Sequence, residues 1–383
     1  MKNYTRLLVM SALAATAAQA APFLAIDDNA EIFLTGTVGV RADSNVFLAA
    51  DDPKRDLDDV IFDFSPGLQL AFGQSSAMQG SLSFVESFTR YADHEDLNDN
   101  LASAAFNSNY DDGKTKFSVN LSYAELNQNT VDTRGTSTFD GLIRRDVFGM
   151  GGTTEVSVTE KSSVGGGLQY SKSDFARAGF SDSQTLTIPV NYYYEMTPKT
   201  DLSFGYRFRQ RWESIGLDTK DHFFNIGARG EFTPKLSGQF AVGFTQRSFK
   251  KPRAATVRRG DESLPGIDAS LTYAASPKTS VLVGVSNDFD TNSQGQQQKN
   301  FAVRLATTTS LSEQWSVTTG LSYRAIDYYT RIDDYFEGQI GATYTISKSI
   351  NVTGAYAYRS NKSDLASSDF EGNVVSLAAN FRF

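Results

Sequence analysis

The carboxyl-terminal stretch Val374-Val375-Ser376-Leu377-Ala378-Ala379-Asn380-Phe381-Arg382-Phe383 alternates between apolar and small or polar residues. Successive side chains of a β-strand point to opposite faces, so this stretch, as a strand, has two unlike faces. One face carries Val375, Leu377, Ala379, Phe381 and Phe383, and the other carries Ser376, Ala378, Asn380 and Arg382. The alternation predicts a strand that separates an apolar environment from a polar one.

The same alternation continues from about Glu31 to the end of the chain, in segments joined by short and longer connections in turn. The short connections are rich in Pro, Asp, Gly, Ser and Lys, which favour tight turns. They are Asp111–Lys114, Glu160–Ser162, Thr197–Thr200, Thr233–Lys235, Ser276–Thr279, Ser312–Gln314 and Ser347–Ser349. The longer ones are Leu48–Leu57, Tyr91–Asp99, Gln128–Leu142, Phe175–Asp182, Glu213–Thr219, Lys250–Ser263, Asn292–Gln298, Asp327–Asp333 and Asn361–Phe370.

Short turns at one end and longer loops at the other are typical of outer-membrane barrels. We therefore predict an all-β fold: a single antiparallel transmembrane β-barrel of about 18 strands, with about 16 as the alternative count, short periplasmic turns and longer extracellular loops. A soluble β-sandwich also alternates. A sandwich of this length would need two or three domains, and no shift in composition marks a boundary. Aromatic residues at strand ends, such as Tyr110, Tyr194 and Trp315, favour the membrane barrel.

Composition excludes several functional classes. The 383 residues include no Cys and two His, His94 and His222, which leaves no thiolate metal site and little material for a histidine metal site or a catalytic triad. A mean hydropathy of −0.33 excludes a bundle of membrane helices. No G-x-S-x-G motif occurs after residue 20. We expect no enzyme, no catalytic residue, no metal and no cofactor.

The amino-terminal 20 residues have the pattern of a secretory signal peptide. Lys2 and Arg6 precede the apolar stretch Leu7–Ala15, and Ala18-Gln19-Ala20 forms the cleavage pattern. We expect residues 1–20 to be removed, residues 21–30 to form a short periplasmic segment, and residues 31–383 to form the barrel in the outer membrane of a Gram-negative bacterium.

Two features resemble known bacterial sequences. The hairpin motifs Asp43-Ser44-Asn45-Val46-Phe47-Leu48 and residues 59–68 (Asp-Val-Ile-Phe-Asp-Phe-Ser-Pro-Gly-Leu) resemble the putative β-barrel porin 2 family. This resemblance implies an outer-membrane barrel of porin-like architecture, some members of which lie in exopolysaccharide loci. The end of the chain resembles the signal for insertion by the barrel-assembly machinery, carried by Val375, Leu377, Phe381 and Phe383.

If the polar face lines the lumen, arginines are its main charged residues. Arg207, Arg209 and Arg211 share one face of a strand, with Arg229 and Arg247 on the next two, and we call these five the basic ladder. The ladder either steers anions through the pore or is neutralised by acids such as Glu195 and Glu231, which would stiffen the wall. The other charges predicted in the lumen are Arg41, Arg145, Arg304, Arg324, Arg359, Asp63, Glu155, Glu195, Glu231, Asp268 and Glu337.

Two loops have alternative interpretations. The connection Gln128–Leu142 either folds inward as a constriction or forms an ordinary external loop. The basic stretch Lys250–Arg259 either binds phosphates of lipopolysaccharide or is a solvated loop.

The expected function is passive diffusion of small hydrophilic, mainly anionic, solutes through a water-filled lumen. The alternatives are a conduit for exopolysaccharide export, which would need periplasmic export proteins as partners, and a structural or adhesive surface barrel with a closed lumen. Expected partners are outer-membrane lipid, lipopolysaccharide and the barrel-assembly machinery, and no nucleic acid.

Overall fold

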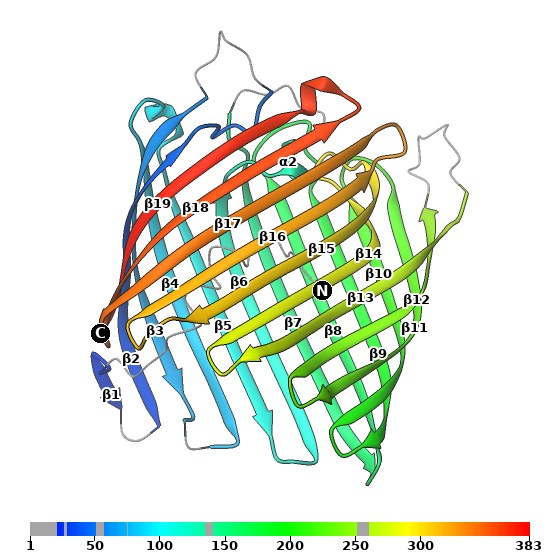
Figure 1. Ribbon diagram of the computed structural model, residues 1–383. Helices are drawn as coiled ribbons and strands as arrows, with labels where there is room; N and C mark the ends of the chain where they lie inside the picture. The colour runs from blue at the N-terminus through cyan, green and yellow to red at the C-terminus, as the bar shows by residue number, and fades with distance from the viewer. Residues whose placement is uncertain (1–20, 27–28, 51–56, 75, 135–140, 251–259) are drawn as a thin grey trace.

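The computed structural model describes residues 21–26, 29–50, 57–74, 76–134, 141–250 and 260–383, which form one closed β-barrel (Figure 1). A short strand, β1 (Leu24–Ile26), pairs with β2 and precedes the barrel. The barrel strands are β2 (Ala30–Asp43), β3 (Asp59–Phe72), β4 (Met78–Tyr91), β5 (Asp99–Asp111), β6 (Thr115–Asn127), β7 (Arg144–Thr159), β8 (Ser162–Phe175), β9 (Ser183–Thr197), β10 (Thr200–Glu213), β11 (Asp218–Thr233), β12 (Leu236–Lys250), β13 (Glu262–Ser276), β14 (Thr279–Thr291), β15 (Gln297–Ser310), β16 (Trp315–Asp327), β17 (Ile332–Ser347), β18 (Ile350–Ser363) and β19 (Phe370–Arg382).

The prediction of a barrel of 18 antiparallel strands is confirmed. Each strand pairs with the next, and β19 pairs with β2, with Leu377 opposite Val40. The last residue completes the closure, because the backbone N–H of Phe383 donates to the carbonyl of Leu34 at 2.9 Å and the N–H of Leu34 donates back at 2.7 Å. Every barrel strand is therefore paired on both sides, although β13 and β14 separate near the loop end. The described part of the chain contains no helix with the length and apolarity needed to span a membrane.

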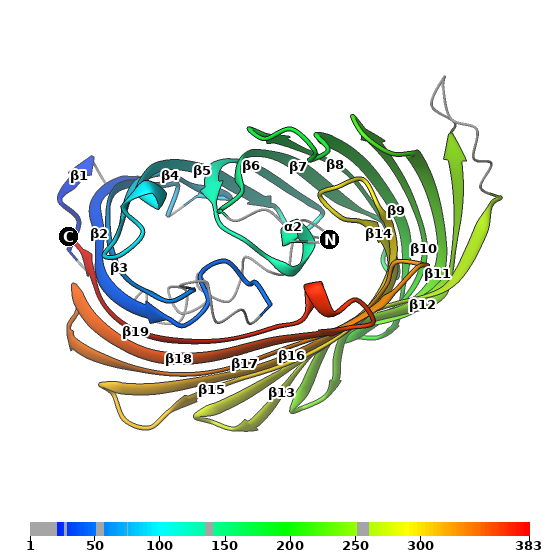
Figure 2. The same ribbon diagram turned by 90° about the horizontal axis from the view of Figure 1, so that it is seen from above.

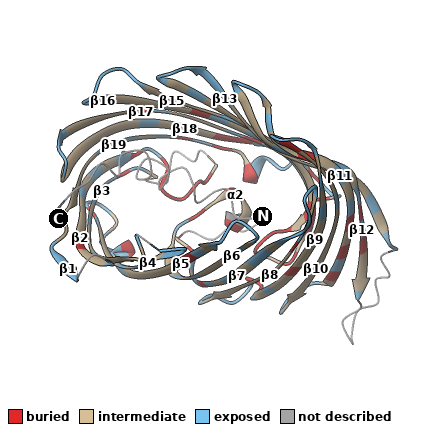
Figure 3. Ribbon diagram, turned by 90° about the horizontal axis from the view of Figure 1, so that it is seen from below, coloured by how far each residue is buried: buried red, intermediate tan, exposed pale blue. Residues whose placement is uncertain are grey.

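The outer face is apolar, as the alternation predicts. Large hydrophobic side chains are exposed on it, including Phe64, Phe84, Val242, Val375 and Leu377. Figure 3 shows exposed residues spread along the strands, and buried ones in segments inside the ring and in the wall near β11 and β12. A soluble protein would bury such side chains, whereas a lipid bilayer solvates them.

Tyrosines mark the loop-side limit of this apolar band. Four of them on the outer face donate their hydroxyls to polar residues nearer the loops: Tyr123 to Glu125 (3.3 Å), Tyr170 to Gln184 (3.0 Å), Tyr323 to Asp334 (2.5 Å) and Tyr356 to Asn373 (2.7 Å). An apolar ring with a hydrogen-bonded hydroxyl suits the boundary between hydrocarbon and water.

The barrel is oval rather than round (Figure 2). At one end of the oval the wall turns back on itself. The pairing of β13 with β14 begins only at Ile267 and Asn287, so the upper part of β14 leaves the wall beside β13. Arg207 and Arg209 of β10 then reach Asp288 of β14, although three strands lie between β10 and β14 in the wall. We call this region, formed by the upper halves of β10, β11, β12 and β14, the folded corner.

Two helical turns and one short α-helix lie outside the strands. The turns η2 (Glu95–Leu97) and η3 (Ala366–Ser368) lie in loops between strands, and α2 (Val131–Arg134) lies in the loop between β6 and β7. Figure 2 shows α2 and the described part of the loop after β2 inside the ring of strands.

Candidate functional site

The basic ladder lies on the inner face of the barrel wall. The register places Arg209 opposite Asp221 of β11, and Asp221 opposite Arg247 of β12. Their neighbours along the strands, such as Phe204 and Phe244, point outward and are exposed. The alternation therefore assigned these arginines to the correct side of the wall.

The ladder is not a row of unpaired charges. Arg207 forms an ion pair with Asp288 at 2.6 Å, and Arg209 forms ion pairs with Asp221 at 2.6 Å and Asp288 at 3.1 Å. Arg211 pairs with Glu213 and lies 3.4 Å from a carboxylate oxygen of Asp290. Every arginine of β10 in the ladder thus faces at least one carboxylate.

Arg247 is the most enclosed member of the ladder. Its side chain is 1% exposed, and its Nε lies 2.6 Å from a carboxylate oxygen of Asp221, which is 3% exposed. One terminal nitrogen donates to the side-chain oxygen of Gln297 at 2.7 Å, and the guanidinium lies over the ring of Phe289 at 4.7 Å. A cation so far from water must be paired, because an unpaired buried charge is strongly unfavourable.

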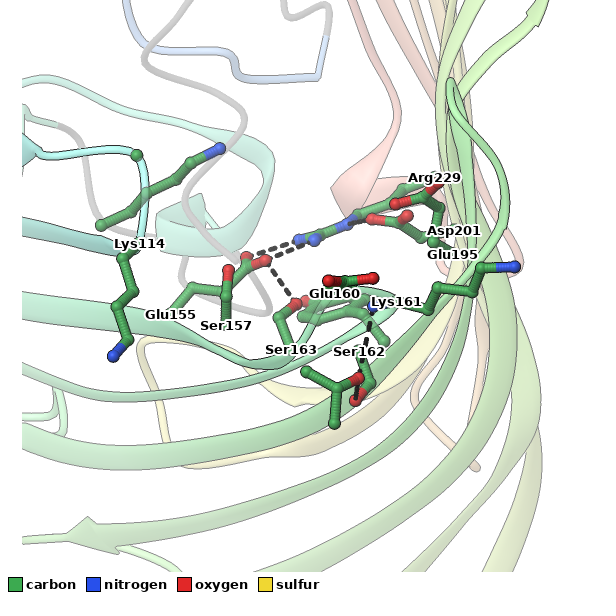
Figure 4. A pocket seen from close by; sticks show the side chains of 14 residues that line it. Lys114, Glu155, Ser157, Glu160, Lys161, Ser162, Ser163, Glu195, Asp201 and Arg229 are labelled. Carbon is green, nitrogen blue, oxygen red and sulfur yellow. Dashed lines mark hydrogen bonds and ion pairs between the residues drawn. The ribbon is translucent and has the colours of Figure 1, made fainter.

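Arg229 lies nearer the short turns, in a pocket lined by polar residues (Figure 4). It donates to Glu155 at 2.7 Å, to Asp201 at 2.9 Å, and stacks on the ring of Tyr193 at 3.4 Å. Glu195 also lines this pocket. The geometry is that of a charge network within the wall.

Two details of the predicted neutralisation are wrong. Glu231 pairs with Lys199 at the turn end, and no ion pair joins Glu195 to an arginine in the described part of the chain. The carboxylates that neutralise the ladder are Asp201, Glu213, Asp221, Asp288 and Asp290, together with Glu155. Asp201 and Glu213 share the alternation phase of Arg207, and Asp221 shares that of Arg229, so the signal was present in the sequence.

Most other predicted lumenal charges also have partners. Arg41 pairs with Asp63 at 3.0 Å, and Arg359 pairs with Asp43 at 2.9 Å. Glu337 accepts a hydrogen bond from the hydroxyl of Tyr335 at 2.8 Å. Arg145 lies 5.9 Å from the ring centre of Phe175, Arg324 pairs with Asp132 at 2.9 Å, and Asp268 and Arg304 lie on β13 and β15.

The loop end of the lumen is crossed by two connections. In the loop between β6 and β7, the side-chain amide of Asn129 donates to the carbonyl of Phe47, in the loop between β2 and β3, at 2.9 Å. Val131 packs with Leu48 of that loop and with Ile326 of the wall in one buried apolar cluster. The described part of the loop between β6 and β7 thus agrees with the inward-folding interpretation.

A bidentate ion pair fastens this loop to the opposite wall. The guanidinium of Arg324 on β16 donates to both carboxylate oxygens of Asp132 in α2, at 2.9 and 3.1 Å. Burial alone would raise the pKa of the Asp132 carboxyl, but the charge and hydrogen bonds of Arg324 hold that pKa below the usual 3.8. Ser293, in the loop between β14 and β15, donates its hydroxyl to the carbonyl of Asp132 at 2.7 Å. Three loops and the wall therefore meet at α2.

Both histidines have structural neighbours. His94 lies 2.8 Å from a carboxylate oxygen of Asp59, and His222 lies 2.8 Å from the hydroxyl of Tyr206. His222 points outward whereas Asp221, adjacent in sequence, points inward. Asp221 and His222 therefore do not face one another as two members of a catalytic triad would.

Some predictions fall on residues outside those that the structure describes. They are the signal peptide at residues 1–20 and the basic residues Lys251, Arg253, Arg258 and Arg259 of the loop after β12.

Comparisons with known proteins agree with this architecture. Residues 216–383 match the model of the family described as putative beta-barrel porin 2. This match agrees with the family that the hairpin motifs resemble, and it lies in a part of the chain that does not include residues 43–68. No curated protein matches the chain.

Solved structures of other outer-membrane proteins are similar in fold. A BenF-like porin from Pseudomonas fluorescens Pf-5 is 11% identical, with 94% of this chain and 100% of that chain covered and a TM-score of 0.49. OccK2 (OpdF) from Pseudomonas aeruginosa is 8% identical, with 92% and 98% covered and a TM-score of 0.49. OccAB3 from Acinetobacter baumannii is 11% identical, with 94% and 100% covered and a TM-score of 0.47. No residue role is carried over from these proteins.

Proposed function

Starting from a porin-like outer-membrane barrel whose residues 216–383 match the putative β-barrel porin 2 family, we propose that this protein is a passive channel for small hydrophilic solutes. The observation that carries the proposal is the character of the inner wall. A closed barrel of 18 strands encloses a lumen too wide to be filled by the side chains of its own wall.

Away from the folded corner, neutral polar side chains of the inner wall bond to one another across strands. Thr37 donates to Asn380, which donates to Asn351, both at 2.9 Å. The hydroxyls of Thr343 and Thr353 are 2.9 Å apart, and Ser65 donates to Ser87 at 3.0 Å. Hydroxyl and amide groups can exchange these bonds with water or with a polar solute at little cost, so such a wall suits a hydrated path.

The anion preference expected from the basic ladder loses its physical basis. Each ladder arginine has a carboxylate partner, so the pairs have little net field in the lumen. We propose that solutes pass this sector without strong selection by charge.

The loops at the mouth favour a second candidate, a surface barrel with a closed lumen, because α2 is tied both to the opposite wall and to a neighbouring loop. An export conduit for a polymer would require a continuous path, and therefore displacement of these loops. We propose no catalytic role.

Single-channel recording in planar bilayers tests the proposal. Purified full-length protein should give discrete conductance steps, and Asp132→Asn, which weakens the tie to Arg324, should increase the step size or the open fraction several-fold. Asp63→Asn changes a carboxylate paired with Arg41 in the wall and serves as the matched control, with an expected change below twofold. If neither the wild type nor Asp132→Asn gives steps, the protein is a closed barrel and the channel proposal is wrong.

A further inference from the structure

Arg304 differs from the other arginines of the inner wall. It lies in the middle of β15, opposite Gly284 of β14 and Ser322 of β16. Among the inner-face arginines that the structure describes, Arg304 alone forms no ion pair, hydrogen bond or ring contact. The others contact acids, aromatic rings or both: Arg41, Arg145, Arg207, Arg209, Arg211, Arg229, Arg247, Arg324, Arg359 and Arg382.

One of the Arg304 atoms that lack a hydrogen-bond partner is also buried. The Nε of Arg304 is shielded from solvent and has no hydrogen-bond acceptor. A buried polar group without a partner calls for an explanation, and a bound water, ion or ligand is one such explanation. The missing partner of a guanidinium N–H is an acceptor, and the strongest acceptors are oxyanions.

The surroundings of Arg304 leave room for such a ligand. At Gly284, an added Cβ would meet nothing closer than the Arg304 Cβ at 3.7 Å and the Ala269 carbonyl at 3.9 Å. On the other side, Ser322 offers a hydroxyl that can donate to a bound anion. In the register of the sheet, Arg304 therefore stands between a residue without a side chain and one with a small donor.

The nearest acid along this row of the wall is Glu337, opposite Ser322 on β17. It is two strands from Arg304, or about 10 Å at the usual spacing, which is too far for an ion pair. The hydroxyl of Tyr335 donates to Glu337. Glu337 thus weakens the field of Arg304 without neutralising it.

We infer that Arg304, with Ser322 beside it, forms an oxyanion-binding site midway along the lumen, for the carboxylate or phosphate group of a permeating solute. The fork of the guanidinium matches the two oxygens of either group. The inference rests on the proposed channel function and deepens it, because it moves charge selection from the paired ladder to one free arginine. Weak, reversible binding at such a point raises the local concentration of anions without blocking their exit.

Calorimetric titration of the detergent-solubilised full-length protein with inorganic phosphate and with acetate tests the site without requiring conductance. Wild type should bind, and Arg304→Gln should weaken binding about tenfold, as expected for a charge-assisted hydrogen bond. Gly284→Glu keeps Arg304 but places a carboxylate opposite it, and should weaken binding similarly. Binding of phosphate but not acetate would assign the site to phosphate groups, and the reverse to carboxylates.

The matched control is the double variant Arg229→Gln/Glu155→Gln, which removes a paired lumenal arginine together with one of its acids. It should bind phosphate as wild type does. Absence of binding by wild type, or equal binding by wild type and Arg304→Gln, would overturn the inference. Loss of conductance steps with retained phosphate binding would instead overturn the channel proposal alone.

Discussion

The folded corner and the sector around β15 both carry arginines on the inner face. The arginines of the corner are paired with acids, whereas Arg304 on β15 is not. In the corner, Asp221 lies between Arg209 and Arg247, and all three side chains are largely buried. On β15, Arg304 has only Gly284 and Ser322 as cross-strand neighbours. Alternation along a strand determines which face a charge occupies, whereas the path of the wall determines whether an acid faces it.

We therefore assign different roles to the charges of the two sectors. Charges in the corner stabilise the fold, because a wall that turns back on itself brings β10 and β14 together and must satisfy the groups that it buries. The charge on β15 is the one that we propose to act on the solute, because its buried Nε has no partner in the described part of the wall.

The largest expected effect is on stability, in the corner. Asp221→Asn removes the carboxylate of the buried Arg247 and should lower the free energy of unfolding by about 3 kcal/mol, since it leaves a buried cation without an acid. Urea unfolding of the barrel in lipid vesicles, followed by tryptophan fluorescence, measures this loss.

The control for that measurement is Asp63→Asn. The side chains of Asp63 and its partner Arg41 are 30% and 35% exposed. This substitution should lower the free energy of unfolding by less than about 1 kcal/mol. Equal losses for the two variants would contradict the division between a structural corner and a solvated wall.

An intermediate effect concerns pH. Because Arg324 lowers the pKa of Asp132 below 3.8, the tie contributes fully above that value and is lost as pH falls through the lowered pKa. Conductance should therefore be constant from about pH 7 to about pH 5 and rise only below about pH 4, as α2 is released. Recordings across this range in Asp132→Asn provide the comparison, since that variant should show no such rise. A rise near neutral pH in wild type would show that another group controls the mouth.

The smallest expected effect is on phosphate binding in the β15 sector. Two unit charges about 10 Å apart in water interact by about 0.4 kcal/mol, so Glu337→Gln should strengthen phosphate binding at Arg304 about twofold. The same titration that locates the site measures this change. Glu195→Gln, in the pocket beside Arg229, is the control and should change nothing at Arg304.

Much of the fold could be predicted from sequence because the apolar–polar period and the turn residues are local signals. The strand count, the closed barrel and the positions of the long loops all follow from them, as the last strand (Val375 to Phe383) illustrates. The inner position of the ladder follows for the same reason.

Only some partners of the ladder could have been assigned in this way. Asp288 meets Arg207 only because the upper part of β14 leaves β13, and no local pattern reports that departure. Asp201, Glu213 and Asp221 could have been found from their alternation phase alone. The tie between Asp132 and Arg324 joins residues far apart in the chain, and its existence depends on the fold of a loop without periodicity.

We propose that Arg304, rather than the basic ladder, sets the charge preference of the lumen. The most direct measurement is the reversal potential in a potassium chloride gradient for wild type, Arg304→Gln and the double variant Arg229→Gln/Glu155→Gln. Arg304→Gln should lower the ratio of chloride to potassium permeability several-fold, and the double variant should match wild type. A shift in the double variant with none in Arg304→Gln would contradict the proposal.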